Sequence, residues 1–156
     1  MWFALLFACS PGTLTNIDPV LDGLLTRLEP CDDLSIAILD PDAVVRLGLQ
    51  TPTDEGGASL VAAAVDGPVS AEFVLPDPTI TARLFFGGGL VGCAGGTDGF
   101  VDAEFVPIAG RLRIDVDAVD VPQVTVTLDD AIFQLAGRED PGPTLGHGEW
   151  SATIAE

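Results

Sequence analysis

The residue best suited to catalysis in this 156-residue chain is its single histidine, His147. A hydrolase of the Ser-His-Asp type needs a histidine and a placed nucleophile, but the sequence contains no Gly-x-Ser-x-Gly turn. Zinc sites commonly take several His or Cys ligands, which one histidine and three cysteines supply poorly. We therefore expect His147 to be exposed in a glycine-rich loop beside Glu149, and a hydrolase is only the second alternative for function.

Carboxylates are the most abundant groups that could bind an ion. Asp115, Asp117 and Asp120 have a spacing similar to the start of a calcium loop, but the glycine and glutamate that such a loop requires are missing. Acids in turns could instead meet at one end of the fold and bind Ca²⁺, and we expect simple solvation as the alternative. The candidates for that weaker metal site are Asp40, Asp42, Asp98, Asp129 and Asp130.

A glycine-rich stretch from Gly87 to Gly92 satisfies the pattern G-x-G-x-x-G. A dinucleotide site also needs a helix directly after the glycines, because the helix N-terminus faces the pyrophosphate. The following residues, from Cys93 to Gly99, include three more glycines and cannot sustain a helix. The pattern therefore indicates a loop, or a strand interrupted by bulges, and no cofactor is expected.

The N-terminus carries an apolar run from Trp2 to Ala8, followed by Cys9 and the polar stretch from Ser10 to Thr13. Leu6-Phe7-Ala8-Cys9 resembles a bacterial lipobox, in which the cysteine is lipidated and becomes the mature N-terminus. The resemblance implies a signal peptide at residues 1–8, a lipidated tether at 9–16 and attachment to the cell envelope, with outer-membrane sorting. Two alternatives stay open: cleavage without lipidation, or a buried strand that contains Cys9.

The two other cysteines are Cys31 and Cys93. If Cys9 takes lipid, as the resemblance implies, these two thiols remain as a pair in an oxidising compartment and could form a disulfide bond. The alternative is two separate buried thiols.

The chain carries 24 acidic and 6 basic residues, for a formal net charge of −18. All the basic residues are arginines. Such a surface repels phosphates, so we expect no nucleic-acid partner. Apolar residues make up 47% of the sequence, which is enough for a folded core.

Short apolar or alternating segments recur about every ten residues from Leu34 onward. This spacing predicts an all-β domain over residues 17–156, an antiparallel β-sandwich or barrel of about nine strands. Asp129-Asp130 is expected to form a turn, and Gly137 to Gly148 a loop. The expected strands are Leu34 to Leu39, Val44 to Leu49, Leu60 to Val65, Val69 to Leu75, Ile80 to Phe86, Phe100 to Val106, Gly110 to Ala118, Val124 to Leu128, Ala131 to Ala136 and Trp150 to Ile154.

One helix is predicted, over residues 18–29. Asp18 is placed as its N-cap, Pro19 at the first helical position, and Pro30 would end it. Leucines recur through the segment at helical spacing, which favours packing against a sheet.

The sequence therefore indicates an acidic β domain, anchored by lipid to a bacterial envelope, with a non-catalytic structural or binding role. Its protein or glycan partner is not specified by any motif. A Ca²⁺-dependent adhesion or recognition module is the first alternative.

Overall fold

The structure is a computed structural model that describes residues 20–31, 35–50, 64, 67–90, 99–117 and 121–153. Strands dominate this part of the chain, and no α-helix occurs within it. The prediction of an all-β domain is confirmed. The strands are β1 (Arg27–Pro30), β2 (Ser35–Leu39), β3 (Val45–Gln50), β4 (Val69–Val74), β5 (Thr81–Gly88), β6 (Phe100–Asp117), β7 (Gln123–Leu135) and β8 (Pro141–Thr153).

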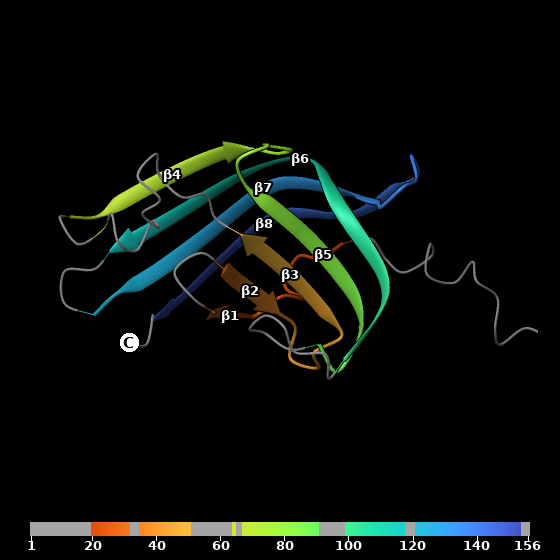
Figure 1. The fold of residues 1–156 in the computed structure, drawn as a ribbon, viewed down its shortest axis with the longest axis horizontal. Coiled ribbons are helices and arrows are strands. Elements are labelled where there is room, and N and C mark those ends of the chain that lie inside the picture. The colour runs from red at the N-terminus through yellow and green to blue at the C-terminus, as the bar shows by residue number, and fades with distance from the viewer. Residues whose placement is uncertain are drawn as a thin grey trace, which may run out of the picture.

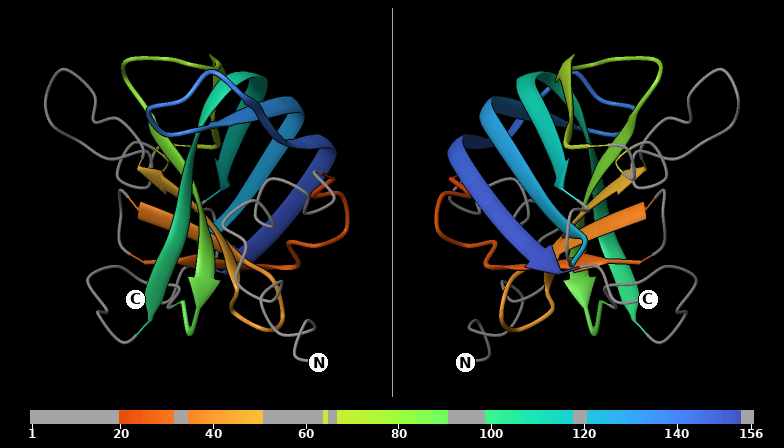
Figure 2. Two further views of the ribbon diagram at one scale, coloured as in Figure 1. Left: turned by 90° about the vertical axis from the view of Figure 1, so that its right-hand side faces the viewer. Right: turned by 90° about the vertical axis from the view of Figure 1, so that its left-hand side faces the viewer.

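The eight strands form one antiparallel sheet in the order β1-β2-β3-β5-β6-β7-β8, with β4 paired to β6. The sheet curls until β1 lies beside β8, so it is nearly a barrel (Figure 1). Seen end-on, the strands make a curved wall around the interior (Figure 2). Of the two architectures expected, the described residues therefore come closer to the barrel than to two stacked sheets.

Strand β6 is the longest strand. Along one of its edges it pairs with two different strands, one after the other. Its first half pairs with β5 and its second half with β4, while β7 follows the other edge along most of its length. The strand bends between these halves, where the register with β7 shifts on both sides of Ala109. Gly110 lies there at a φ of 141°, a value that L side chains rarely adopt, and Asp130 on β7 has a φ of 50°. The irregularity lets one strand contribute to both parts of the curled sheet.

Three long strands replace the shorter ones predicted in the second half of the chain. The break expected between Val106 and Gly110 is absent, because the bulge keeps β6 continuous through Pro107. The turn expected at Asp129-Asp130 is likewise wrong, because β7 continues through both residues. The loop expected up to Gly148 ends earlier, because β8 begins at Pro141 and pairs with β7.

The helix predicted over residues 18–29 does not form in its described part, from Val20 onward. Gly23 adopts a φ of 76° within a turn, which interrupts a right-handed helix. The backbone bonds instead to neighbouring strands: Leu21 N–H donates to Thr144 O at 2.8 Å, and β1 pairs with β2. The helical spacing was misleading because Leu21 and Leu25 reach the core from the two sides of this turn, and Leu28 reaches it from strand β1.

Inward-facing side chains from all eight strands and from residues 20–25 pack into one apolar cluster. Alternation along the strands supplies these residues, as in Leu112, Ile114 and Val116 of β6. Trp150 joins β8 to the N-terminal segment, because its indole N–H donates to Leu25 O at 2.8 Å. This contact lies at the seam where the curled sheet approaches closure.

A repeated sequence, Ala-Glu-Phe-Val, occurs at 71–74 and at 103–106, and each copy is followed by a segment with proline and then by Arg-Leu, at 83–84 and at 111–112. In the structure each phenylalanine lies opposite the leucine of the other copy. Phe73 lies opposite Leu112 on β6, and Phe105 of β6 lies opposite Leu84 on β5. Both phenylalanines are buried in the core. The two copies therefore occupy equivalent positions in the antiparallel pairing of β6 with β4 and β5.

Asp40 is the buried acidic residue of the described chain, with 1% of its surface exposed. It lies at the turn between β2 and β3, where its carboxylate accepts three backbone hydrogen bonds. Val44 N–H and Val45 N–H donate to Oδ1, both at 2.8 Å, and Asp42 N–H donates to Oδ2 at 3.2 Å. The side chain thus satisfies amide groups that the turn leaves without strand partners.

Asp40→Ala should destabilise the domain by about 2–4 kcal/mol, because it leaves buried amide donors unsatisfied. Urea unfolding of the purified chain measures this free energy. Asp42→Ala is the matched control, since that side chain is exposed, and it should change stability by no more than about 0.5 kcal/mol. Equal stability of the two variants would show that Asp40 does not hold the turn.

Candidate functional site

The outward side of β4, β6, β7 and β8 carries a regular array of polar side chains, which we call the outer polar face. Antiparallel register places one residue from each strand in a row across the sheet. The three rows are Ser70-Asp115-Thr125-Ser151, Glu72-Arg113-Thr127-Glu149 and Val74-Arg111-Asp129-His147.

A groove of about 710 Å³ runs over this face. Its walls come from β4, β6, β7 and β8, and its charged lining consists of four carboxylates and two guanidiniums. The groove is therefore negatively charged overall. Its lining includes the charged or hydroxyl-bearing residues Glu72, Arg111, Arg113, Asp115, Thr125, Thr127, Asp129 and Glu149.

The two arginines of the groove are held by neighbouring acids. Arg113 Nε lies 2.9 Å from an oxygen of Asp115, and Arg113 Nη1 lies 4.0 Å from Glu72. Arg111 Nη2 lies 3.4 Å from Asp130. These groups are exposed, so each pair stabilises the fold little. Their effect is to fix where positive and negative charges stand on the face.

His147 lies at one end of the array and contacts Asp129 on the adjacent strand. The distance between His147 Nδ1 and Asp129 Oδ1 is 2.5 Å. An ionised carboxylate can only accept, so Nδ1–H is the donor. The imidazole remains 63% exposed, in agreement with the exposure predicted from the sequence, although it stands on a strand and not in a loop.

Asp22 approaches the same histidine from the N-terminal segment. Its carboxylate accepts hydrogen bonds from Gly146 N–H at 2.8 Å and His147 N–H at 3.2 Å. These bonds hold the turn at Asp22 against β8. They also lower the pKa of Asp22, chiefly through Gly146.

The pKa of His147 is raised above its usual value. The main cause is the hydrogen bond to Asp129, and the negative charges of Asp129, Glu149 and Asp22 add to it. The imidazolium is therefore favoured at a higher pH than in an isolated histidine. Asp129 orients this ring as the acid of a catalytic triad would, but no hydroxyl of a described serine or threonine bonds to His147.

The acids proposed for calcium lie in two separate places. Asp40 and Asp42 belong to the turn between β2 and β3, where Asp40 is already bonded to backbone amides. Asp129 and Asp130 lie on β7, beside His147 and Arg111 respectively. Asp98 lies outside the described residues. Nowhere in the described ranges do three or more His, Cys, Asp or Glu side chains gather in a way that could hold a metal ion.

Two of the three cysteines, Cys9 and Cys93, lie outside the described residues, so lipidation and the Cys31–Cys93 bond remain predictions. Cys31 is half-buried after β1, and its Sγ lies 3.6 Å from Glu29 O. Residues 1–16, with the predicted signal peptide and tether, are also outside the described part. Among the residues that the structure describes, no helix has the length and apolar character needed to cross a membrane.

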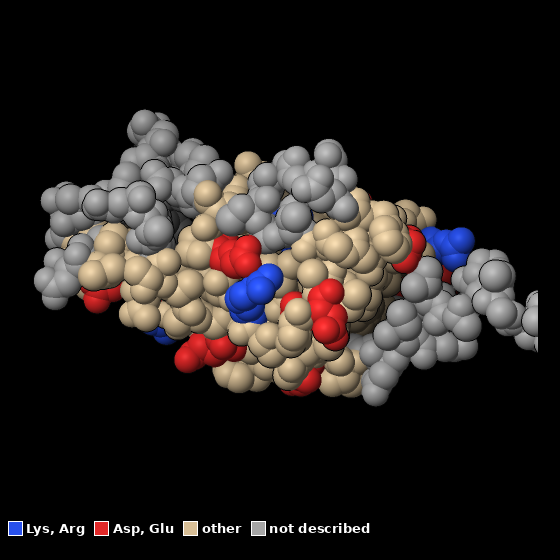
Figure 3. All heavy atoms as spheres, turned by 90° about the horizontal axis from the view of Figure 1, so that it is seen from below, with Lys and Arg blue, Asp and Glu red and all other residues tan. Residues whose placement is uncertain are grey.

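On the side of the molecule shown in Figure 3, acidic and basic side chains stand interspersed among uncharged residues. Arg111, Arg113, Asp115 and Asp117 alternate in the sequence with apolar residues, and this alternation indicates that the four side chains point to the same outer side of a strand. The groove has no such signal in the sequence, because it depends on which strands are neighbours. The alternating threonines of β7, Thr125 and Thr127, were the remaining signal for an exposed polar row.

Comparisons of the chain with protein-family models, with curated proteins and with solved structures gave no match. The candidate site therefore rests on the geometry of the outer polar face alone.

The imidazole of His147 should titrate above 6.5 in the folded protein, and Asp129→Asn should lower its pKa. NMR can follow this without ambiguity because the chain has one histidine. A raised pKa in the folded state stabilises the fold fully below pH 6.5, and this contribution disappears as pH rises through the folded value. The stability difference between the wild type and His147→Gln should therefore shrink as pH increases.

Asp130→Asn is the matched control, since Asp130 pairs with Arg111 and lies next to Asp129 in the sequence. This variant should leave the titration of His147 close to that of the wild type. A pKa of His147 that does not change in Asp129→Asn would contradict the assigned hydrogen bond.

Proposed function

We propose that this protein is a lipid-anchored domain of the bacterial cell envelope with a non-catalytic binding role. In this proposal residues 1–8 are a signal peptide, Cys9 carries the lipid, and residues 9–16 form the tether to an outer-membrane leaflet. The support is the lipobox-like sequence Leu6-Phe7-Ala8-Cys9. Two or more acyl chains give stable attachment, which a single chain does not.

The groove on the outer polar face is the observation that carries the binding role. The inward side chains pack together as the core, so partners meet the outer side of the sheet. The groove lies across four strands, which hold its charged groups in a fixed order. A rigid array of this kind recognises a partner with less ordering cost than a loop would.

The charge of the groove indicates the kind of partner. Four carboxylates against two guanidiniums favour a partner with a basic surface, and the net charge of −18 attracts the same partner over a longer range. Aromatic side chains are few, at 6% of the sequence, and among the described residues that line the groove only Phe73 is aromatic. A basic protein or peptide therefore fits this groove better than a glycan that stacks on aromatic rings.

Expression of the full chain in bacteria that take up labelled palmitate tests the anchor. The wild type should carry the label and sediment with membranes, whereas Cys9→Ser should carry none and remain in the extracytoplasmic soluble fraction. Cys31→Ser is the matched control and should be labelled like the wild type. Labelling that persists in Cys9→Ser would overturn the proposed lipid site.

Photo-crosslinking in the bacterium that naturally makes the protein tests whether a partner binds in the groove. A photoreactive phenylalanine analogue at Thr127, inside the groove, should give a discrete adduct that weakens in the double variant Glu72→Gln/Glu149→Gln. The same analogue at Arg138, which is exposed outside the groove, should not give this adduct. Identical adducts from both positions, or none from Thr127, would contradict binding through the groove.

A further inference from the structure

Arg46 differs from the arginines of the groove because the part of the chain that the structure describes offers it no acidic partner. No carboxylate in the described part of the chain lies within ion-pair distance of its guanidinium, and its Nε is buried without a hydrogen-bond partner. Arg138 also has no ion pair among the described residues, but it is exposed in a turn. A partly buried cation without an ion pair in the described ranges is notable in so acidic a chain, since a buried polar group is usually satisfied.

The position of this guanidinium is fixed by its neighbours on the outer side of β3 and β5. Its Cζ lies 5.7 Å from the ring centroid of Phe85, which stands opposite Arg46 in the register of the two strands. Gly48 follows on the same side of β3, and a Cβ at Gly48 would lie 3.8 Å from Arg46 Cζ and from Nη2. The missing side chain leaves a hollow beside the guanidinium.

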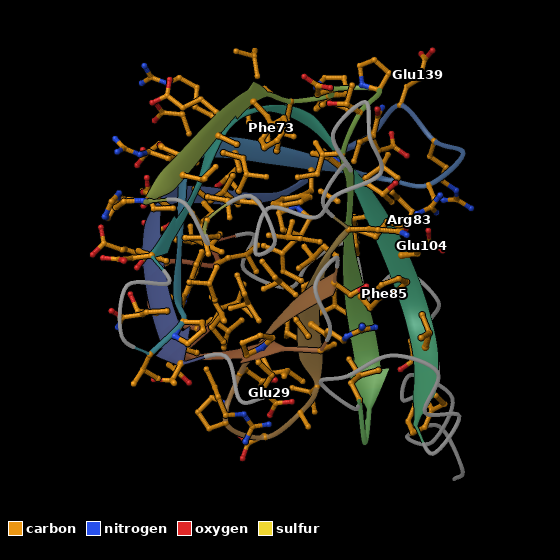
Figure 4. All side chains as sticks on the ribbon, turned by 60° about the vertical axis from the view of Figure 1, so that its left-hand side comes forward. Glu29, Phe73, Arg83, Phe85, Glu104 and Glu139 are labelled. Carbon is orange, nitrogen blue, oxygen red and sulfur yellow. The ribbon has the colours of Figure 1, made fainter. Side chains whose placement is uncertain are left out.

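This hollow is a small pocket of about 170 Å³ on the outer side of β2, β3 and β5. Polar groups of Gln50, Thr81 and Arg83 line it together with Arg46. Arg83 is already paired with Glu104 of β6, and Figure 4 shows these two side chains close together above Phe85. The charge of Arg83 is thus largely compensated, whereas Arg46 has no ion pair among the described residues.

We propose that this pocket binds a carboxylate group, with the guanidinium of Arg46 as the main contact. A planar guanidinium held by an aromatic ring can donate two parallel hydrogen bonds to a planar carboxylate. Thr81 and Gln50 line the same pocket and carry further hydrogen-bond donors. The net charge of −18 repels a dianion more strongly than a monoanion, which favours a carboxylate over sulfate or phosphate. The site is separate from the groove of the outer polar face.

Acetate titration of the purified full chain, followed by NMR at constant ionic strength, tests the proposal. The Gly48 amide and the Arg46 Nε–H signals should shift and saturate with a Kd of about 1–10 mM. Sulfate should bind at least several-fold more weakly. Arg46→Met should abolish saturation, and Arg138→Met, which changes the net charge equally, should bind acetate like the wild type.

Two further variants keep the test decisive if Arg46→Met unfolds. Gly48→Val places a branched side chain in the hollow, and valine is well tolerated in a strand. This variant should weaken acetate binding about ten-fold or more. Arg46→Lys keeps the charge and removes the planar donor pair, so affinity should fall several-fold. The proposal is overturned if shifts are linear in acetate and alike at all arginines, or if Arg46→Met and Arg138→Met behave identically.

Discussion

The bend in β6 is the constraint on which the rest of the sheet depends. At this point Gly110 approaches β7 so closely that a Cβ would lie 3.1 Å from the Cα of Ala131. The bulge increases the local twist and changes the direction of both strands without ending their pairing. Because the strand continues past the bend, β5 can pair with one half of β6 and β4 with the other. The same continuity keeps the polar residues of β6 and β7 in register, which builds the rows of the outer polar face.

Curling brings the two ends of the sheet together, and the N-terminal segment completes the contact. Residues 20–25 bond to β8 through backbone groups and through the carboxylate of Asp22, while the indole of Trp150 reaches back to Leu25. These interactions join parts of the chain more than a hundred residues apart. These interactions compete with helix formation in this segment. The leucines can be buried in a helix or in the observed conformation, so their burial does not favour either one. Gly23 favours the turn, and the observed conformation therefore prevails.

Charge is distributed in two ways over the outer side of the sheet. On the face formed by β4, β6, β7 and β8, arginines stand among acids and each has a partner. On the side formed by β2, β3 and β5, Arg46 rests on Phe85 with no acid beside it among the described residues. The strong negative charge of the chain repels anions over a distance of about one Debye length, roughly 8 Å at physiological salt, so a local cation can act only at short range. The two surfaces are therefore suited to ligands of opposite charge.

The sequence by itself determined the fold class and the direction of most strand side chains, because strand alternation and buried valine, leucine and isoleucine are local signals. It also determined that His147 would be exposed. Strand lengths were decided by the tertiary structure, since a bulge in β7 at Asp130 and a strand rich in glycine and proline, β8, are stabilised only by their partners. The conformation of residues 20–29 was likewise decided by the hydrogen bonds of this segment to β2 and β8. The groove and the pocket beside Arg46 follow from which strands become neighbours, and no local pattern encodes that choice, because pairing partners are selected by long-range burial of the common core.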